Sequence, residues 1–224
     1  MAKKKQPIAP SKRSPRGERT RARLVAAARI VFEKDGFAPA RIVDIAKKAR
    51  IAIGSFYTYF QTKEEILRAV VDLVDAELSA PLPADVGTDQ LARIEAGTRA
   101  YVQRFKQNAR ILAVLQHRTV EDPELYTIRR RSLDRWIARA ERSIRRLQAE
   151  GHVPKALSPR FAATVVTGMV HSFCYETYAF GTTSDLDDDQ VSKGLAEMWA
   201  RAIGLDVTAP QRAHEARRAH AGGH

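Results

Sequence analysis

Cysteine is almost absent from this sequence: Cys174 is the single example, so no disulfide can form within the chain, and a reducing compartment is expected. Long apolar runs are absent too. The longest candidate, residues 161–170, is interrupted by two threonines and a glycine, whereas a membrane-spanning helix needs roughly 18 or more apolar residues. No apolar stretch follows the first lysines, as it would in a secretory signal. We therefore expect a cytoplasmic protein without membrane contact.

Acidic residues are scarce at the start of the chain. Residues 1–60 hold fifteen Lys or Arg against four Asp or Glu, a balance of +11, while the rest of the chain carries only +1. Six of the bases belong to a proline-containing arm, residues 1–16, which has no apolar period and is expected to be disordered. Without them, residues 17–60 still carry +5. Such a surface suits binding to a phosphate backbone, although a solvated charged tail is the alternative for the arm.

Residues 41–60 read as two short helices joined by a tight turn. The apolar spacing of residues 42–49 is that of an amphipathic helix, and residues 53–60 predict a second helix of about two turns, anchored by Phe56 and Phe60. A helix this short is not stable alone. Its outward side chains are small, hydroxylated and uncharged, which suits close approach to a phosphate-lined groove. A helical hairpin inside an ordinary core is the alternative.

The flanks of this stretch carry helix-end signals. A helix is predicted over residues 17–35, with Gly36 at its C-terminal end. Thr62 and Glu65 have the spacing of a capping box, so another helix begins here. Together with these, the residues Gly36-Phe37, Asp44-Ile45-Ala46, Ala49, Gly54, Tyr57-x-Tyr59-Phe60 and Lys63-Glu64-Glu65 resemble the DNA-binding domain of the tetracycline-repressor (TetR) family of bacterial transcriptional regulators. The resemblance covers about residues 18–78.

The resemblance implies an all-α fold of about nine helices. A three-helix helix-turn-helix head would occupy residues 17–63, with the motif itself at 41–60. A helical ligand-binding and dimerisation bundle would occupy residues 64–206, and residues 207–224 would be a disordered tail. The apolar periods after the head agree with this class, because no segment alternates as a strand would. They predict helices over residues 63–80, from Thr88, 109–120, 123–150, 159–178 and 187–204.

The resemblance also implies residue roles in the head. Ile53, Gly54 and Ser55 fall where family members face bases in the major groove. Tyr57, Tyr59 and Lys63 fall where phosphate contacts are usual, and Thr58 suits either role. Arg41 stands where the family usually has a capping Ser or Thr and is expected to supply a charge-assisted phosphate contact instead.

The sequence departs from the family pattern at three further positions. Ala40 and Ala52 replace residues that usually cap helices, and each lost cap should cost on the order of 1 kcal/mol. Arg50 stands where the turn usually carries glycine, and a non-glycine residue with positive φ is strained by roughly 1 kcal/mol or more. We expect a less stable head with the same fold.

The bundle is expected to hold a small-molecule pocket. Six aromatic or polar residues lie on otherwise apolar faces, a mixture typical of ligand sites, although each one also suits an ordinary core: Tyr101, Phe105, Gln116, Trp136, His171 and Tyr175. The helix over residues 123–150 carries eight arginines, which suggests either an anionic ligand or, in the simpler interpretation, a solvated face. The helix from Pro159 is apolar nearly all round and should be covered on several sides. The resemblance implies that the last two long helices form a homodimer interface.

The resemblance implies a ligand-responsive repressor that binds a palindromic operator in double-stranded DNA as a homodimer and is released by a lipophilic or amphipathic effector. No cofactor, metal or catalytic residue is expected. A constitutive DNA-binding protein without an effector is the main alternative. A thiol enzyme using Cys174, near His171 and Tyr175, is a weaker one. The tail histidines His214, His220 and His224 match no metal-ligand spacing.

Overall fold

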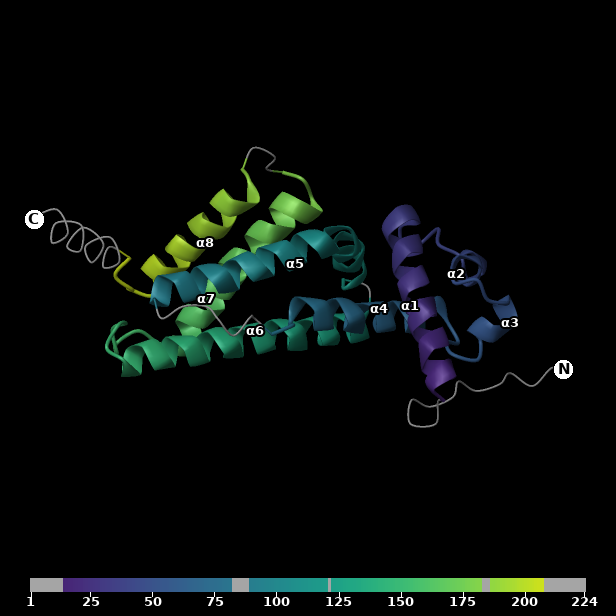
Figure 1. Cartoon of the computed structure of the whole chain (residues 1–224), viewed down its shortest axis with the longest axis horizontal. Helices are drawn as coiled ribbons and strands as arrows, with labels where there is room; N and C mark the ends of the chain where they lie inside the picture. Colours follow the sequence, from purple (N-terminus) through teal and green to yellow (C-terminus); the bar gives the residue numbers. More distant parts are fainter. Residues whose placement is uncertain (1–13, 82–88, 121, 183–185, 208–224) are drawn as a thin grey trace, which may run out of the picture. The chain divides into compact units, whose positions relative to one another are not determined.

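The computed structural model describes residues 14–81, 89–120, 122–182 and 186–207. Within these ranges the chain is helical without any β-strand, which confirms the predicted class. The elements are α1 (Pro15–Asp35), α2 (Ile42–Lys48), α3 (Ile53–Phe56), α4 (Lys63–Leu78), α5 (Gln90–Arg118), α6 (Pro123–Ala149), α7 (Pro159–Cys174), the π-helix η2 (Tyr175–Ala179) and α8 (Asp188–Ala202) (Figure 1). None of the helices in the described part of the chain is long and apolar enough to cross a membrane.

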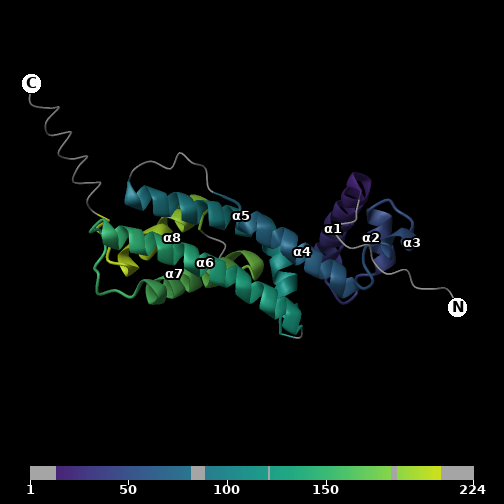
Figure 2. The same ribbon diagram turned by 90° about the horizontal axis from the view of Figure 1, so that it is seen from below.

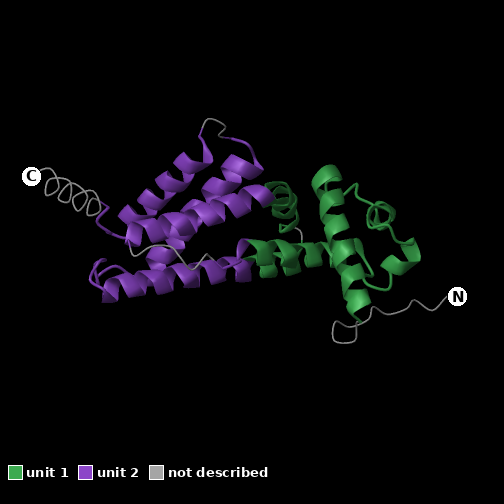
Figure 3. Cartoon of the chain, viewed as in Figure 1, with its two compact units in different colours: residues 1–77, 108–129 green, residues 78–107, 130–224 purple. Residues whose placement is uncertain are grey.

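The chain forms two compact units (Figure 3). Unit 1 comprises residues 1–77 and 108–129, and unit 2 comprises residues 78–107 and 130–224. The predicted head, 17–63, is therefore part of a larger unit that also takes in most of α4 and the segment where α5 ends and α6 begins. Most of the predicted arm and nearly all of the predicted tail lie outside the described residues.

Helix α1 begins earlier than predicted because Ser14 and Pro15 form its cap. The Ser14 side chain accepts a hydrogen bond from the Gly17 N–H at 3.3 Å, and Pro15 occupies the first turn, where its missing N–H costs nothing. Gly36 ends the helix, as predicted, with φ of 77° and its N–H bonded to the Phe32 carbonyl. The buried stripe of the helix is Leu24, Val25, Ala27, Ala28, Val31 and Phe32.

The prediction of two helices over residues 88–120 is wrong, because α5 is one helix of 29 residues. No proline or glycine interrupts the sequence between residues 98 and 122, so nothing ends the helix where a break was expected. Asp89 caps its start, accepting from the Ala92 N–H at 2.7 Å. The expected start at Thr88 lies outside the described residues. Among the described helices α5, rather than the 27-residue α6, is the longest.

Unit 2 is a helical bundle in which its parts of α5 and α6 run alongside each other (Figures 1 and 2). Ser158 caps α7 through its side chain, as the Ser-Pro pair predicts. The helix was expected to run on to residue 178, but its α-helical part ends at Cys174 and continues as the π-helical turn η2. Helix α8 opens with a full capping box between Asp187 and Gln190. The core of the unit is formed by Ile137, Ile144, Leu147, Val153, Ala162, Ala163, Val166, Ala200, Ile203 and Leu205.

Candidate DNA-binding surface and ligand pocket

The turn between α2 and α3 is strained as the sequence predicts. Arg50 has φ of 55° and is the only non-glycine residue of the described chain with positive φ, a conformation that costs an L-residue roughly 1–2 kcal/mol. Arg23, on α1, braces this turn. Its Nη2 donates to the carbonyl oxygens of Ala49 at 2.5 Å and Arg50 at 3.5 Å. The sequence predicts the strain, but it gives no signal for this brace, because Arg23 lies 27 positions earlier.

Helix α3 is shorter than the two turns predicted. Only Ile53–Phe56 is α-helical, and the chain continues in tighter turns in which the Thr58 N–H donates to the Ser55 carbonyl at 3.2 Å. Phe56 and Phe60 are 0% and 1% exposed, which confirms them as the buried anchors. The Arg21 guanidinium lies over the Phe60 ring, 5.1 Å from its centre. Two buried rings, rather than its own hydrogen bonds, therefore hold the short helix in place.

The outward face of α3 and the following turn is uncharged. Ile53 and Tyr57 are 48% and 42% exposed, although both are large apolar side chains. Gly54 is exposed, and a Cβ added there would meet no atom within 4 Å. Ala52, at the start of the helix, has no side chain that could accept a hydrogen bond from the first N–H groups. The six predicted DNA-contact residues from Ile53 to Tyr59 thus form one continuous segment, in which Ser55, Thr58 and Tyr59 are half-buried.

Arg41 lies at the start of α2 and has no capping bond to it, as the missing Ser or Thr predicts. Its Nε donates to Asp44 Oδ2 at 2.8 Å and its Nη2 to Oδ1 at 3.1 Å. This pair of hydrogen bonds holds the pKa of the Asp44 carboxyl below its usual value. The Arg41 side chain remains 71% exposed, so a phosphate can approach its free edge only by sharing the guanidinium with Asp44.

Lys63 has a structural contact that the sequence did not predict. Its Nζ donates to the carbonyl oxygens of Phe37 at 2.8 Å, Ala38 at 2.9 Å and Ala40 at 3.0 Å. An ammonium group has three hydrogens to donate, so all three have partners in the loop between α1 and α2. Lys63 and Arg118 both lie against the Phe37 ring, 4.5 and 4.6 Å from its centre. Lys63 therefore holds this loop in shape.

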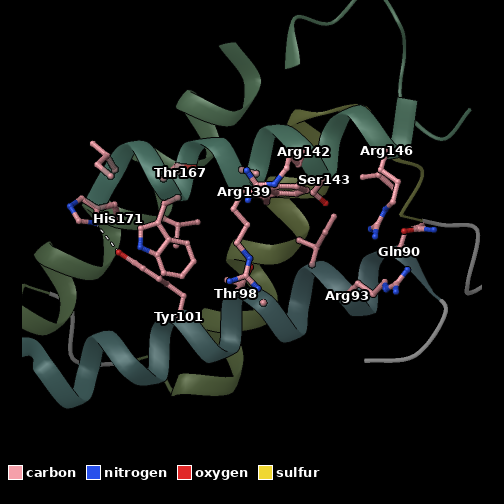
Figure 4. Close-up of a pocket in the computed structure, with 18 residues that line it drawn as sticks. Gln90, Arg93, Thr98, Tyr101, Arg139, Arg142, Ser143, Arg146, Thr167 and His171 are labelled. Carbon is pink, nitrogen blue, oxygen red and sulfur yellow. Dashed lines mark hydrogen bonds between the residues drawn. The ribbon is translucent and has the colours of Figure 1, made fainter. Parts of the chain in front are cut away.

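A pocket of about 520 Å³ lies in unit 2, between α5 and α6, with further walls from α7 and α8 (Figure 4). Its surface is mainly apolar, through Ile94, Leu133, Trp136, Leu147, Val170 and Trp199. Trp136 and Trp199 are the two tryptophans of the chain. Hydroxyl groups of Thr98, Ser143 and Thr167 add neutral polar atoms to the lining.

Three of the six predicted pocket residues line this cavity: Tyr101, Trp136 and His171. The Tyr101 hydroxyl and His171 Nδ1 share a hydrogen bond of 2.8 Å (Figure 4). The rings of Tyr101 and Trp136 meet edge to face at 4.9 Å. The structure therefore brings these residues, which are far apart in the sequence, to one end of the pocket.

The other three predicted residues do not line the pocket. Phe105 and Tyr175 lie behind it, where their rings meet at 4.9 Å and each also packs on His171. Gln116 belongs to unit 1, roughly four turns further along α5 than Tyr101. Gln116 was expected in the pocket as a polar group on an otherwise apolar face, but it is not among the residues that line this cavity.

Four arginines in the lining were not predicted as pocket residues: Arg93, Arg139, Arg142 and Arg146. The arginine-rich face of α6 suggested either an anionic ligand or a solvated face, and Arg139 now lines the same cavity as Trp136. On α5, Arg93, Gly97 and Tyr101 follow each other at four-residue spacing. Since that spacing keeps side chains on one face of a helix, Arg93 was a recognisable companion of Tyr101.

The structure gives no support to thiol or metal chemistry. Cys174 is fully buried, and burial raises the pKa of its thiol to about 12. At neutral pH the group is therefore protonated and a poor nucleophile. The described residues contain no cluster of three side chains suited to a metal ion, and His214, His220 and His224 lie outside them.

Comparisons with known proteins agree with the geometry of unit 1. Residues 24–70 match the family model described as bacterial regulatory proteins, tetR family. The chain is 25% identical to the HTH-type transcriptional regulator SrpR of Pseudomonas putida, over 82% of this chain and 85% of that protein. It is 23% identical to the HTH-type transcriptional regulator EthR of Mycobacterium tuberculosis, over 84% of this chain and 89% of that protein.

Solved structures share the whole architecture. A putative TetR-family transcriptional regulator from Mesorhizobium loti superposes with a TM-score of 0.67 at 16% identity, covering 86% of this chain and all of that one. The fatty acid degradation regulator FadR from Bacillus halodurans gives 0.64 at 21% identity, covering 84% and 96%. At these identities the likeness concerns the fold.

The fold and the matched region together define a helix-turn-helix DNA-binding protein. Residues 24–70 of this chain form a DNA-binding domain of the tetR family of bacterial regulatory proteins. Over most of its length the chain is similar to two proteins named as HTH-type transcriptional regulators.

Proposed function

We propose that the protein is a repressor that binds a palindromic operator as a homodimer and is released by a small amphipathic effector. The observation that carries the proposal is the face of α3: an exposed, uncharged strip fixed by two buried rings and set in the basic part of the chain. Uncharged side chains of this kind can approach base edges and phosphates closely, because no charged group has to lose its hydration on the way. As an operator-bound regulator, the protein acts in the cytoplasm, at the chromosome.

In this proposal Ile53, Gly54 and Ser55 face the major groove. Gly54 leaves open space where a side chain would stand, which allows the backbone to approach the DNA closely. Tyr57, Thr58 and Tyr59 supply hydroxyl groups to phosphates or base edges. The two basic residues act differently: Arg41 shares its guanidinium between Asp44 and a phosphate, and Lys63 keeps the neighbouring loop in place.

Dimer formation through α7 and α8 is supported by apolar side chains on the surface of unit 2. Phe161 and Val165 on α7 and Met198 on α8 are 66%, 48% and 58% exposed. Gly168 and Gly194 lie in the same two helices with nothing within 4 Å of an added Cβ. Glycine inside a helix costs roughly 0.5–1 kcal/mol relative to alanine, and close approach of a second copy gives a reason to retain it. Two heads would then reach half-sites roughly 34 Å apart.

The effector site in this proposal is the pocket between α5 and α6. If ligand and operator favour different arrangements of the two heads, each weakens binding of the other by the same factor, typically 5- to 150-fold. Helix α5 carries both pocket residues and Arg118, whose guanidinium rests on Phe37. This contact offers a route from the pocket helix to the loop that Lys63 holds.

Selection of fragments from genomic DNA by the purified protein tests the proposal. We expect recovery of a short inverted repeat, bound by two copies of the chain. Affinity should fall steeply with salt, by about 0.9 log units per log unit of salt for each phosphate neutralised. Recovery of unrelated fragments with a flat salt response would contradict it. If the protein stays bound to a selected fragment whatever small amphipathic molecule is added, the result would favour a constitutive DNA-binding protein without an effector.

A further inference from the structure

The charge of the pocket lining is entirely of one sign. Four arginines line it, Arg93 from α5 and Arg139, Arg142 and Arg146 from α6, and no Asp or Glu is among the lining residues. Elsewhere on the protein the arginines commonly pair with carboxylates, as Arg145 does with Glu141 at 2.7 Å. An apolar cavity edged by unbalanced positive charge is unfavourable for a cation and favourable for an anion.

The pocket arginines keep donors for a ligand. Arg93 and Arg142 are exposed, and neither forms an ion pair with any residue in the described part of the chain. Arg146 has one long contact, 3.7 Å from its Nε to Glu150. Arg139 is half-buried, with its guanidinium 5.8 Å from the Trp136 ring centre. A guanidinium carries five N–H donors in a planar fork that matches carboxylate and phosphate oxygens.

The two ends of the pocket are lined by different kinds of side chain. Figure 4 shows Tyr101 and His171 at one end and Gln90, Arg93 and Arg146 at the other. Gln90 and Tyr101 are separated by about 16 Å along α5, at 1.5 Å per residue. At the aromatic end the Tyr101 hydroxyl and the His171 ring are hydrogen-bonded to each other, and no charged arginine is needed to satisfy them. A ligand that fills this space is elongated, with its charged group at the arginine end.

We propose that the pocket binds an amphipathic anion: an unbranched apolar chain lying over Trp136, with a carboxylate or phosphate head held away from the aromatic end by arginines of the lining, Arg93 and Arg142 among them. This inference rests on the proposed function for the idea that the pocket receives an effector, and it adds the sign of the charge and the orientation of the molecule. Apolar lining supplies most of the affinity by burial, and the arginines select the head group through charge-assisted hydrogen bonds.

A series of twelve-carbon (about 1.5 nm extended) probes with one tail and different heads tests the charge. Dodecanoate and dodecyl phosphate are the anionic members, dodecanol is neutral, and dodecyltrimethylammonium is cationic. Because both tryptophans line the pocket, their fluorescence reports binding to the full-length protein directly. We expect the anions to bind at least roughly tenfold more tightly than either other head. Equal affinity across the series, or a preference for the cation, would overturn the proposal.

Two variants and one control locate the head group. Arg93→Ala and Arg142→Ala should each weaken dodecanoate binding about five- to tenfold, while dodecanol binding stays unchanged. Arg131→Ala is the matched control, since Arg131 is an exposed arginine of α6 outside the pocket lining, and it should leave both affinities unchanged. Arg142→Lys, which keeps the charge, should retain part of the anion preference. Wild-type dodecanoate affinity in both alanine variants would contradict the assigned head-group site.

The fluorescence measurement needs no DNA, so the anion site and the release of DNA by an effector can be tested independently of each other. Tight binding of dodecanoate that leaves a selected DNA fragment bound supports the anion site and counts against effector release by this molecule. Release of the fragment by dodecyltrimethylammonium, with no binding of dodecanoate, would overturn the anion site while leaving ligand-responsive regulation in place.

Discussion

The head and the pocket are both rich in basic residues, but those residues serve the two regions differently. In the head, Arg23 and Lys63 donate to backbone carbonyl oxygens, and Arg41 is bonded to Asp44. The surface that faces outward from α3 carries no charge. In the pocket, Arg93 and Arg142 point to no carboxylate of the described chain and remain available. A count of charges finds the basic head, yet it does not tell which basic residues contact a ligand and which hold the backbone.

The largest predicted effect is on DNA binding, and it comes from substituting Gly54. Gly54→Leu should reduce operator binding to the non-specific level, a loss of roughly a thousandfold, because the added side chain fills the space through which the backbone approaches DNA. It should leave thermal stability unchanged or slightly raised, since it meets no atom of the free protein. Gel shifts and thermal unfolding measure the two effects.

Ala26→Leu is the matched control for that variant, because it adds the same kind of side chain on the exposed side of α1. It should retain wild-type operator affinity. Full operator binding by Gly54→Leu would mean that α3 does not lie in the groove. Ligand binding in the absence of DNA should be unchanged in the same variant, because Gly54 is not a residue of the pocket lining.

A second variant tests the structural role of Lys63. Lys63→Ala leaves three carbonyl oxygens without their donor, two of them, at Phe37 and Ala40, in partly buried hydrogen bonds, so the free energy of unfolding should fall by about 2 kcal/mol. Lys48→Ala, which removes an exposed lysine at the end of α2, should change it by less than about 0.5 kcal/mol. Urea unfolding measures both. If Lys63→Ala kept full stability and lost only DNA affinity, Lys63 would be a phosphate contact instead.

A third variant removes the strained conformation between α2 and α3. Arg50→Gly relieves the left-handed strain, and part of that gain is offset by the greater freedom of glycine in the unfolded chain. We expect a net stabilisation of about 0.5–1 kcal/mol, measured by urea unfolding. Arg50→Ala keeps the Cβ and should give no such gain. A loss of stability in Arg50→Gly would show that the arginine side chain itself stabilises the turn.

The smallest expected effect is at Cys174. In the native protein at pH 8 the thiol should not react with iodoacetamide over hours, because it is fully buried and burial raises its pKa to about 12. After unfolding in urea it should react at the rate of an ordinary thiol. Mass spectrometry of the two samples measures this. Rapid alkylation of the folded protein would reopen the possibility of thiol chemistry.

Local signals made much of the fold predictable from the sequence. Ser158-Pro159 and Gly36 act through neighbours within a few positions, and the anchors Phe56 and Phe60 are recognisable from their four-residue apolar spacing; the structure confirms each one. The strain at Arg50 could also be predicted, because only its own backbone conformation is involved.

Contacts between distant segments were not predictable in the same way. Arg23 braces a turn 27 positions away, and Lys63 bonds to carbonyls 23 to 26 positions earlier. The pocket depends on which faces of α5 and α6 meet, so its aromatic end was partly predicted, while for its arginines an anionic ligand and a solvated face both remained open. The uninterrupted α5 could have been recognised from the lack of proline and glycine between residues 98 and 122.

The most direct test of the account measures the coupling between the two regions from both sides. Dodecanoate affinity is determined by tryptophan fluorescence with and without a saturating DNA fragment that the protein selects, and fragment affinity is determined with and without dodecanoate. We predict that each weakens binding of the other by one common factor of roughly 5- to 150-fold. Affinities that do not change in either direction would contradict the account.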